Sequence, residues 1–224
     1  MSTTQPVSFQ SIQVCALRAT RLSAAGVPQT GAGTTNGYIS KAPIMVKLSP
    51  DNEKGVELKV ENGCGTLGGY YQAPDQLKKY NISFSLTDLD SELIELLTDE
   101  PIVSVGGSTV GKTSKRSSAC ATASRNGVAI EFWSKKWNAC SVPSGNSLYW
   151  HWFMPWAFLQ TGEVTMENDF MKVPIEGYLQ ENPNFARGGW TSGNWPDPAG
   201  LPACWGVVTD SFFPTAASGY QAVV

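Results

Sequence analysis

The sequence predicts an all-β protein: a β-sandwich or flattened barrel of two packed sheets, with one short flanking α-helix. Several segments alternate apolar and polar side chains with the period of two that a strand with one buried face produces. The 224 residues include 22 glycines and 14 prolines, which supply the many turns of an all-β chain. A helical stripe of apolar residues, in contrast, is clear in one segment.

Length and charge narrow the functional classes. A chain of this length fits one domain with arms at its ends, so we expect an arm over residues 1–11, a sandwich over 12–180 and an irregular tail rich in Gly, Pro and Trp over 181–224. The net charge is −3 and charged residues make up 16%, which leaves no basic face for a dedicated nucleic-acid binder. The N-terminus resembles no signal peptide, so we expect synthesis in a cytoplasm.

The five cysteines do not predict a disulfide framework. They are odd in number and widely spaced, and the chain has one histidine to help build a metal site. We interpret them as small packed residues in a reducing compartment and expect no metal or cofactor.

The first half of the predicted sandwich holds a strand, a hairpin and a further strand. Residues 12–22 are expected to form the first strand. In residues 44–48 the apolar Ile44, Val46 and Leu48 alternate with Met45 and Lys47, and residues 56–60 alternate apolar and charged residues. The polar segment 49–55 between them is expected to be a hairpin turn. Residues 62–79 read as a loop, and residues 80–87 (YNISFSLT) alternate perfectly.

The period changes after residue 87. Leu93, Ile94, Leu96 and Leu97 form a helical stripe, and Asp90 is a suitable N-cap. We expect a short helix that ends near Thr98 and packs against an end of the sheet. Further strands are expected at 101–105 and 128–133, followed by a hairpin of residues 163–166 and 171–179.

Residues 148–159, LYWHWFMPWAFL, have too many apolar faces for a strand with one solvated side. One face carries Tyr149, His151 and Phe153, and the other carries Trp150, Trp152 and Met154. With Pro155 inside, the run is too short to span a membrane. Another copy of the protein or the Trp-rich tail must therefore cover the second face, and the expected subunit interface consists of Trp150, Trp152, Met154 and Trp156.

The segment 106–113, GGSTVGKT, matches the P-loop pattern letter for letter after a short apolar strand. A P-loop would hold phosphates with its backbone amides, Lys112 and Thr113. The following SKRSSACATASRNG lacks an apolar helical face, and the predicted hairpins do not form a parallel sheet. We therefore interpret the match as accidental.

Other candidate sites are weaker. Glu131 and Glu176 suggest a glycosidase pair, but nothing places them together, and both read as outward strand charges. His151 has no obvious nucleophile partner and reads as a packed residue. Five tryptophans could form a platform on which sugars stack: Trp150, Trp152, Trp190, Trp195 and Trp205. We favour packing in the core or at an interface as their role.

A series of segments resembles one family, the major tail tube proteins of long-tailed, non-contractile bacteriophages, especially those that infect actinobacteria. The series covers roughly residues 13–195. The specificity of the resemblance lies in the order and spacing of the segments rather than in one motif. The segments are VCALRATRLSAAGVP, VELKVENGCG, LKKYNISFSLTDLDSELIELLTDEP, GVAIEFWSKKW, LYWHWFMPWAFLQTGEVTMENDFMKVPIEGY and RGGWTSGNW. Residues 196–224 do not match the family.

The resemblance implies a structural virion protein without enzymatic activity. Six copies would form a ring, and stacked rings would form the tail tube, assembled in the host cytoplasm around a tape measure protein. Double-stranded DNA would later pass through without specific binding, which a net negative charge favours. The residues expected to contact the next ring are those of the predicted hairpin tip: Pro50, Asp51, Asn52, Glu53 and Lys54.

Two rival functions remain. One is a carbohydrate-binding β-sandwich that uses surface tryptophans. The other is a nucleotide-binding enzyme that uses Lys112.

Overall fold

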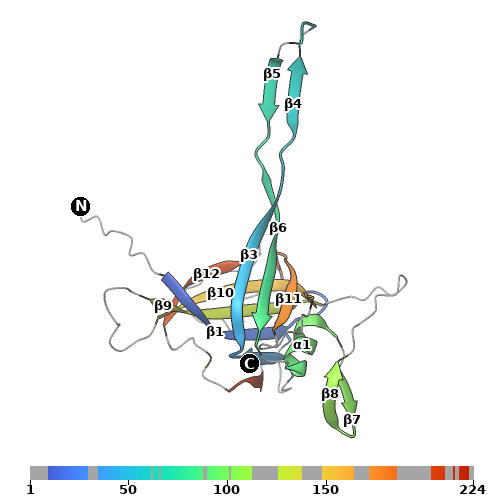
Figure 1. Ribbon diagram of the computed structural model, residues 1–224, viewed down its shortest axis with the longest axis vertical. Coiled ribbons are helices and arrows are strands. Elements are labelled where there is room, and N and C mark those ends of the chain that lie inside the picture. The colour runs from blue at the N-terminus through green and yellow to red at the C-terminus, as the bar shows by residue number, and fades with distance from the viewer. Residues whose placement is uncertain are drawn as a thin grey trace, which may run out of the picture.

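The computed structural model confirms an all-β chain with one short helix in its described part (Figure 1). It describes residues 10–29, 35–61, 63–65, 67–87, 90–100, 102–112, 126–137, 148–163, 172–185, 203–209, 214 and 217–221. The helix is too short to cross a membrane, and no other helix occurs in those ranges.

Nine strands form one continuous antiparallel sheet, in the order β13-β2-β1-β9-β10-β11-β6-β3, with β12 paired to β10. Two pairs, β4–β5 and β7–β8, form separate two-stranded ribbons. The strands are β1 (Gln10–Arg21), β2 (Gly37–Ser40), β3 (Pro43–Glu53), β4 (Glu57–Glu61), β5 (Leu67–Gln72), β6 (Gln76–Leu86), β7 (Ile102–Val105), β8 (Ser108–Lys112), β9 (Val128–Trp137), β10 (Leu148–Thr161), β11 (Val173–Leu179), β12 (Cys204–Thr209) and β13 (Gly219–Gln221).

The large sheet bends over itself, so the two expected layers are parts of one sheet. Strand β3 lies at one edge of the sheet order, yet it packs against β1, which is several strands away. Apolar side chains from β1, β6, β9, β10 and β11 meet in one core. This closure buries one face of the sheet without a second, independent sheet.

Strand β10 changes neighbours at Pro155. Residues 148–153 pair with β12, and residues 157–161 pair with β11. The register with β9 shifts between Met154 and Ala157, which marks a bulge. Proline lacks the amide hydrogen that a central strand needs, and a bulge is where a sheet tolerates it. The bulge thus allows two strands to share one edge of β10.

Both faces of β10 are covered within one copy along part of its length. Met154, Ala157 and Leu159 belong to the main core. Phe153 lies in a second cluster with Leu22, Ala129 and Phe185, and its ring centroid is 5.0 Å from that of Phe185. Residues beyond 180 therefore cover the second face in part. This agrees with one of the two alternatives expected from the sequence, in which the C-terminal tail supplies the cover.

The predicted helix is confirmed as α1 (Ser91–Thr98). The side chain of Asp90 accepts hydrogen bonds from the amides of Glu92 and Leu93, which is the N-cap arrangement. The four apolar residues of its stripe are buried in the main core.

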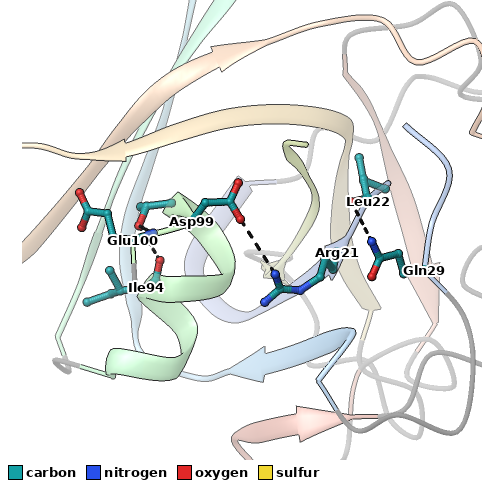
Figure 2. Close-up of polar contacts among 7 residues, drawn as sticks. Arg21, Leu22, Gln29, Ile94, Asp99 and Glu100 are labelled. Atoms are coloured by element: carbon teal, nitrogen blue, oxygen red, sulfur yellow. Dashed lines mark hydrogen bonds and ion pairs between the residues drawn. The ribbon is translucent and has the colours of Figure 1, made fainter. Parts of the chain in front are cut away.

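The end of α1 faces β1 (Figure 2). Thr98 Oγ1 donates to the carbonyl of Ile94 at 2.7 Å and accepts from the amide of Glu100 at 3.3 Å. Asp99 Oδ1 lies 4.0 Å from Arg21 Nη1. These contacts end the helix and place its last turn beside the sheet.

Two predicted elements are wrong. Residues 49–55 are not a turn, because β3 runs to Glu53 and pairs with β6, not with residues 56–60. Residues 62–79 are not wholly loop, since β5 and the start of β6 lie there. Local alternation identified the strands correctly, but pairing depends on which distant segment completes the sheet.

The ends of the chain also differ from the prediction. The segment 181–224 is not irregular throughout, because β12 and β13 add two strands to the main sheet. The frequent Gly, Pro and Trp residues of this segment obscure the alternation of apolar and polar residues from which such short strands are predicted. At the other end β1 begins at Gln10, so residues 10 and 11 belong to the sheet, and the rest of the predicted arm lies outside the described residues.

Candidate assembly surfaces

A long two-stranded arm projects from the folded sheet. We define the arm as residues 54–75, which contain β4 and β5 and continue outward from β3 and β6 (Figure 1). At its base the amide of Gly55 donates to Asp75 Oδ1 at 3.0 Å, and the amide of Ala73 donates to the carbonyl of Val56 at 3.0 Å. A Cβ on Gly55 would lie 1.9 Å from the Ala73 carbonyl oxygen, so glycine is required at this joint.

The arm has one apolar and one charged face. Leu58 pairs with Tyr71, and Val60 pairs with Gly69. Paired residues of antiparallel strands share a face, and Val56 continues the alternation. The apolar arm face therefore consists of Val56, Leu58, Val60 and Tyr71. Each of these residues is 57% to 65% exposed.

The opposite face is polar. Glu57 and Lys59 form an ion pair at 2.6 Å, and the Lys59 ammonium lies 5.9 Å from the centroid of the Tyr70 ring. Gln72 lies opposite Glu57 on this face. The alternation noticed in the sequence is thus real, but the apolar side faces solvent in a single copy rather than a core.

The residues predicted to contact a neighbouring ring do not form a hairpin tip. Pro50, Asp51, Asn52 and Glu53 lie on the outer half of β3, and Lys54 lies at the base of the arm. The tip is instead near Gly63–Gly65, between β4 and β5. The sequence could not show this, because the arm is a continuation of β3 and β6 and not their turn.

The residues of the expected interface on β10 are partly or fully buried within a single copy. Trp150, Trp152 and Trp156 are partly buried, and Trp156 Nε1 donates to the Asn126 carbonyl at 2.8 Å. Met154 is 0% exposed in the core of one copy, so its assignment to a subunit interface is wrong. Met154 follows Trp152 in ordinary alternation and faces the main core, whereas the bulge at Pro155 places Trp156 beside the second cluster.

A buried charge cluster lies on the second face of β1, β9 and β10. Arg18 forms an ion pair with Glu131, and His151 Nε2 lies 3.6 Å from Glu131 Oε2. The His151 ring stacks on Trp133 with centroids 4.5 Å apart, and the Arg18 guanidinium carbon lies 5.1 Å from the Trp133 centroid. The prediction that Glu131 is an outward charge is wrong, since it is 3% exposed.

The cluster holds Glu131 as a carboxylate. Burial by itself raises the pKa of Glu131, but the charge of Arg18 and the neighbouring His151 outweigh burial and bring the pKa below its ordinary value of 4.5. Burial lowers the pKa of Arg18, and Glu131 opposes that effect. The mixed faces of the first strand, caused by Arg18 and Arg21, were the signal in the sequence. The register that places Arg18 opposite Glu131 was not readable there.

The P-loop-like segment forms a hairpin in its described part. Gly106 and Gly107 have φ values of 62° and 84° and join β7 to β8, as in a two-residue type I′ turn. Residues 108–112 pair with β7 as a strand, whereas a P-loop leads into a helix whose amides face the phosphate. Thr113 lies outside the described residues.

The structure does not bring together the carboxylates of the suggested glycosidase pair. Glu131 lies opposite Phe153, and Glu176 lies opposite Gln160, seven positions farther along β10. At about 3.3 Å per residue the two are separated by roughly 20 Å, whereas paired glycosidase carboxylates lie at most about 9.5 Å apart.

The tryptophans with described side chains do not form an exposed platform. Trp133 is 0% exposed, and Trp150, Trp152 and Trp156 are partly buried. Trp190 and Trp195 lie outside the described residues, and Trp205 lies in β12, where the backbone alone is described.

No protein-family model matches the sequence, and no curated protein matches it.

Proposed function

We propose that the protein is a structural virion protein that assembles with copies of itself into stacked hexameric rings, which form the tail tube of a long-tailed bacteriophage. Its role is mechanical: the tube is built around a tape measure protein and later conducts double-stranded DNA. Ring size, tube and partners rest on the family resemblance of the sequence segments.

The observation that carries the proposal is the arm. A two-stranded ribbon that leaves the sheet with a bare apolar face is marginally stable in water by itself. Exposed apolar surfaces of this kind mark interaction sites. Ten large apolar residues of the described chain are exposed, and seven of them lie on or next to the arm: Val56, Leu58, Val60, Leu67, Tyr70, Tyr71 and Leu77. A neighbouring copy that covers this ribbon supplies the missing layer.

The net charge and the buried charge cluster favour a conduit for DNA over a protein that binds DNA or another charged ligand. The net charge of −3 repels phosphate, which favours passage of DNA over retention. The Arg18 guanidinium and the Glu131 carboxylate of the charge cluster pair with each other inside a single copy and are not presented to a ligand.

The full-length chain tests the proposal directly. Sedimentation velocity over a range of concentrations should show discrete oligomers that grow with concentration, and negative-stain electron microscopy should show rings or tubes. A strictly monomeric species at high concentration would overturn the proposal. A tube that retains DNA as tightly at high salt as at low salt would contradict the conduit role.

A further inference from the structure

An apolar cavity of about 290 Å³ opens between β3 and the facing strands β1, β9 and β10. It has about twice the volume of the roughly 150 Å³ cavity that accommodates benzene in an engineered protein. The cavity therefore has room for about two apolar side chains. Its lining is apolar except for one residue: Val14, Val46, Leu48, Phe132, Ser134 and Trp152.

The polar residue of the lining lacks a partner. Ser134 is 3% exposed, and its Oγ makes no hydrogen bond to any described residue. A buried hydroxyl without a partner is unfavourable, because it has given up its hydrogen bonds to water. A backbone amide or carbonyl that enters with apolar side chains would satisfy it, so the lining suits an incoming strand better than a plain hydrocarbon.

The arm has the complementary surface, but it cannot enter the cavity of its own copy. Val46 and Leu48 line the cavity from β3, and the same strand then runs away from the sheet into the arm (Figure 1). The apolar arm face exposes on the order of 400 Å², about half of the ~800 Å² per partner that a stable interface buries. Each arm–cavity contact therefore has about half the area of a standard interface, and a copy makes two such contacts, one as donor and one as acceptor.

We infer that the apolar arm face of one copy docks in the cavity lined by Val46, Leu48 and Ser134 of a second copy. The inference rests on the proposed function and names the acceptor of the arm. Because donor and acceptor are different surfaces, the contact is heterologous and propagates from copy to copy until it closes or forms a stack.

Matched substitutions test the two sides separately. Leu58→Glu places a charge on the apolar arm face, and Gln72→Glu places the same charge on the polar face as its control. Val46→Phe fills the cavity from β3, and Met45→Phe adds the same ring on the exposed side of that strand. Val14→Phe fills the cavity from β1, so the test does not depend on the folding of one variant, and circular dichroism checks all five.

The expected result is specific to the arm and the cavity. Leu58→Glu, Val46→Phe and Val14→Phe should raise the concentration needed for assembly about tenfold or more, and the two controls should assemble like the wild type. An equimolar mixture of Leu58→Glu and Val46→Phe should give a product of twice the mass of the unit that either variant forms alone, because one intact arm then meets one intact cavity.

Other outcomes separate the two proposals. Normal assembly of folded cavity variants would overturn the docking inference and leave the proposed function standing. Loss of assembly in Leu58→Glu alone, with no product in the mixture, would indicate that arms pair with arms and would also overturn it. A wild type that never assembles would overturn both proposals.

Discussion

Individual residues show how this chain combines ordinary strand faces with one buried polar cluster. Arg18, Glu131 and His151 occupy neighbouring strands, and Trp133 packs against both the cation and the imidazole. A buried ion pair contributes little net stability compared with an apolar pair, but the loss of one partner leaves a charge without compensation. The cluster therefore makes the register of β1, β9 and β10 costly to change.

Removal of one charge should destabilise the fold more than removal of both. We expect Arg18→Met to lower the free energy of unfolding by about 3–5 kcal/mol, since it leaves the Glu131 carboxylate buried. The double variant Arg18→Met/Glu131→Leu should recover a large part of that loss. Urea denaturation of the two single variants and the double variant measures the coupling.

An exposed ion pair supplies the control for this cycle. Lys59→Met breaks the pair with Glu57 on the arm, where both side chains are more than two fifths exposed. The free energy of unfolding should change by less than about 1 kcal/mol. Equal losses in Arg18→Met and Lys59→Met would contradict the role assigned to burial.

The lowered pKa of Glu131 predicts an acid-sensitive fold. A carboxyl whose pKa is lower in the folded state stabilises the protein above its unfolded pKa, and that contribution disappears as the pH falls through the folded pKa. Stability should therefore decrease as the pH is lowered below about 4.5. Glu131→Gln should be less stable at neutral pH but show a weaker pH dependence between pH 5 and 3, measured by urea denaturation at each pH. Parallel curves would refute the assignment.

At the scale of elements, the arm and the helix show opposite relations between sequence and environment. The helix stripe is buried by the sheet of the same copy, so its pattern predicted both the element and its packing. The arm carries an equally clear pattern, yet its apolar face has no cover in one copy. Alternation thus indicates that a face will be covered, but not by which chain.

Deletion of the outer arm should separate folding from assembly. A variant that replaces residues 57–72 with Asn-Gly keeps the joint at Gly55 and Asp75 and removes a ribbon that buries no part of either core. We expect a change of a few degrees or less in the melting temperature and the loss of rings and tubes in electron micrographs. A variant that still forms tubes would show that the arm is not needed.

At the scale of the whole molecule, contacts across long stretches of sequence close the sheet. Asn182 is 0% exposed and donates to the carbonyls of Gly26 and Pro155 at 2.7 and 3.1 Å, so it connects the turn after β1 with the bulge in β10. Its Oδ1 accepts from the amide of Asn184 at 3.1 Å. One side chain thereby connects three segments that are far apart in the chain.

Loss of this connection should weaken the entire fold. Asn182→Ala leaves two buried carbonyls without their donor, and we expect a loss of about 2–3 kcal/mol in the free energy of unfolding. Asn184→Ala removes one exposed contact to the Ala25 carbonyl and should have a much smaller effect. The melting temperatures of the two variants provide the comparison, and similar values would argue against the connecting role of Asn182.

The sequence by itself determined the class of fold, most strand positions and the helix with its Asp90 cap. These features depend on side chains close together in the chain, whose periodicity reports local geometry. It also located the aromatic strand β10 and the amphipathic strand of the arm. The type I′ turn at Gly106 and Gly107 likewise follows from two adjacent glycines, although the P-loop pattern concealed it.

Only the tertiary structure decided which strands pair, where the arm ends and which polar groups meet. Residues 57–61 pair with residues 67–72, Arg18 reaches Glu131, and the bulge after Met154 places Trp156 beside the second cluster. Each of these depends on register between segments that are distant in sequence, and a shift of one residue moves every side chain to the other face. No local pattern carries that information, because strand pairing is selected by the closure of the whole sheet.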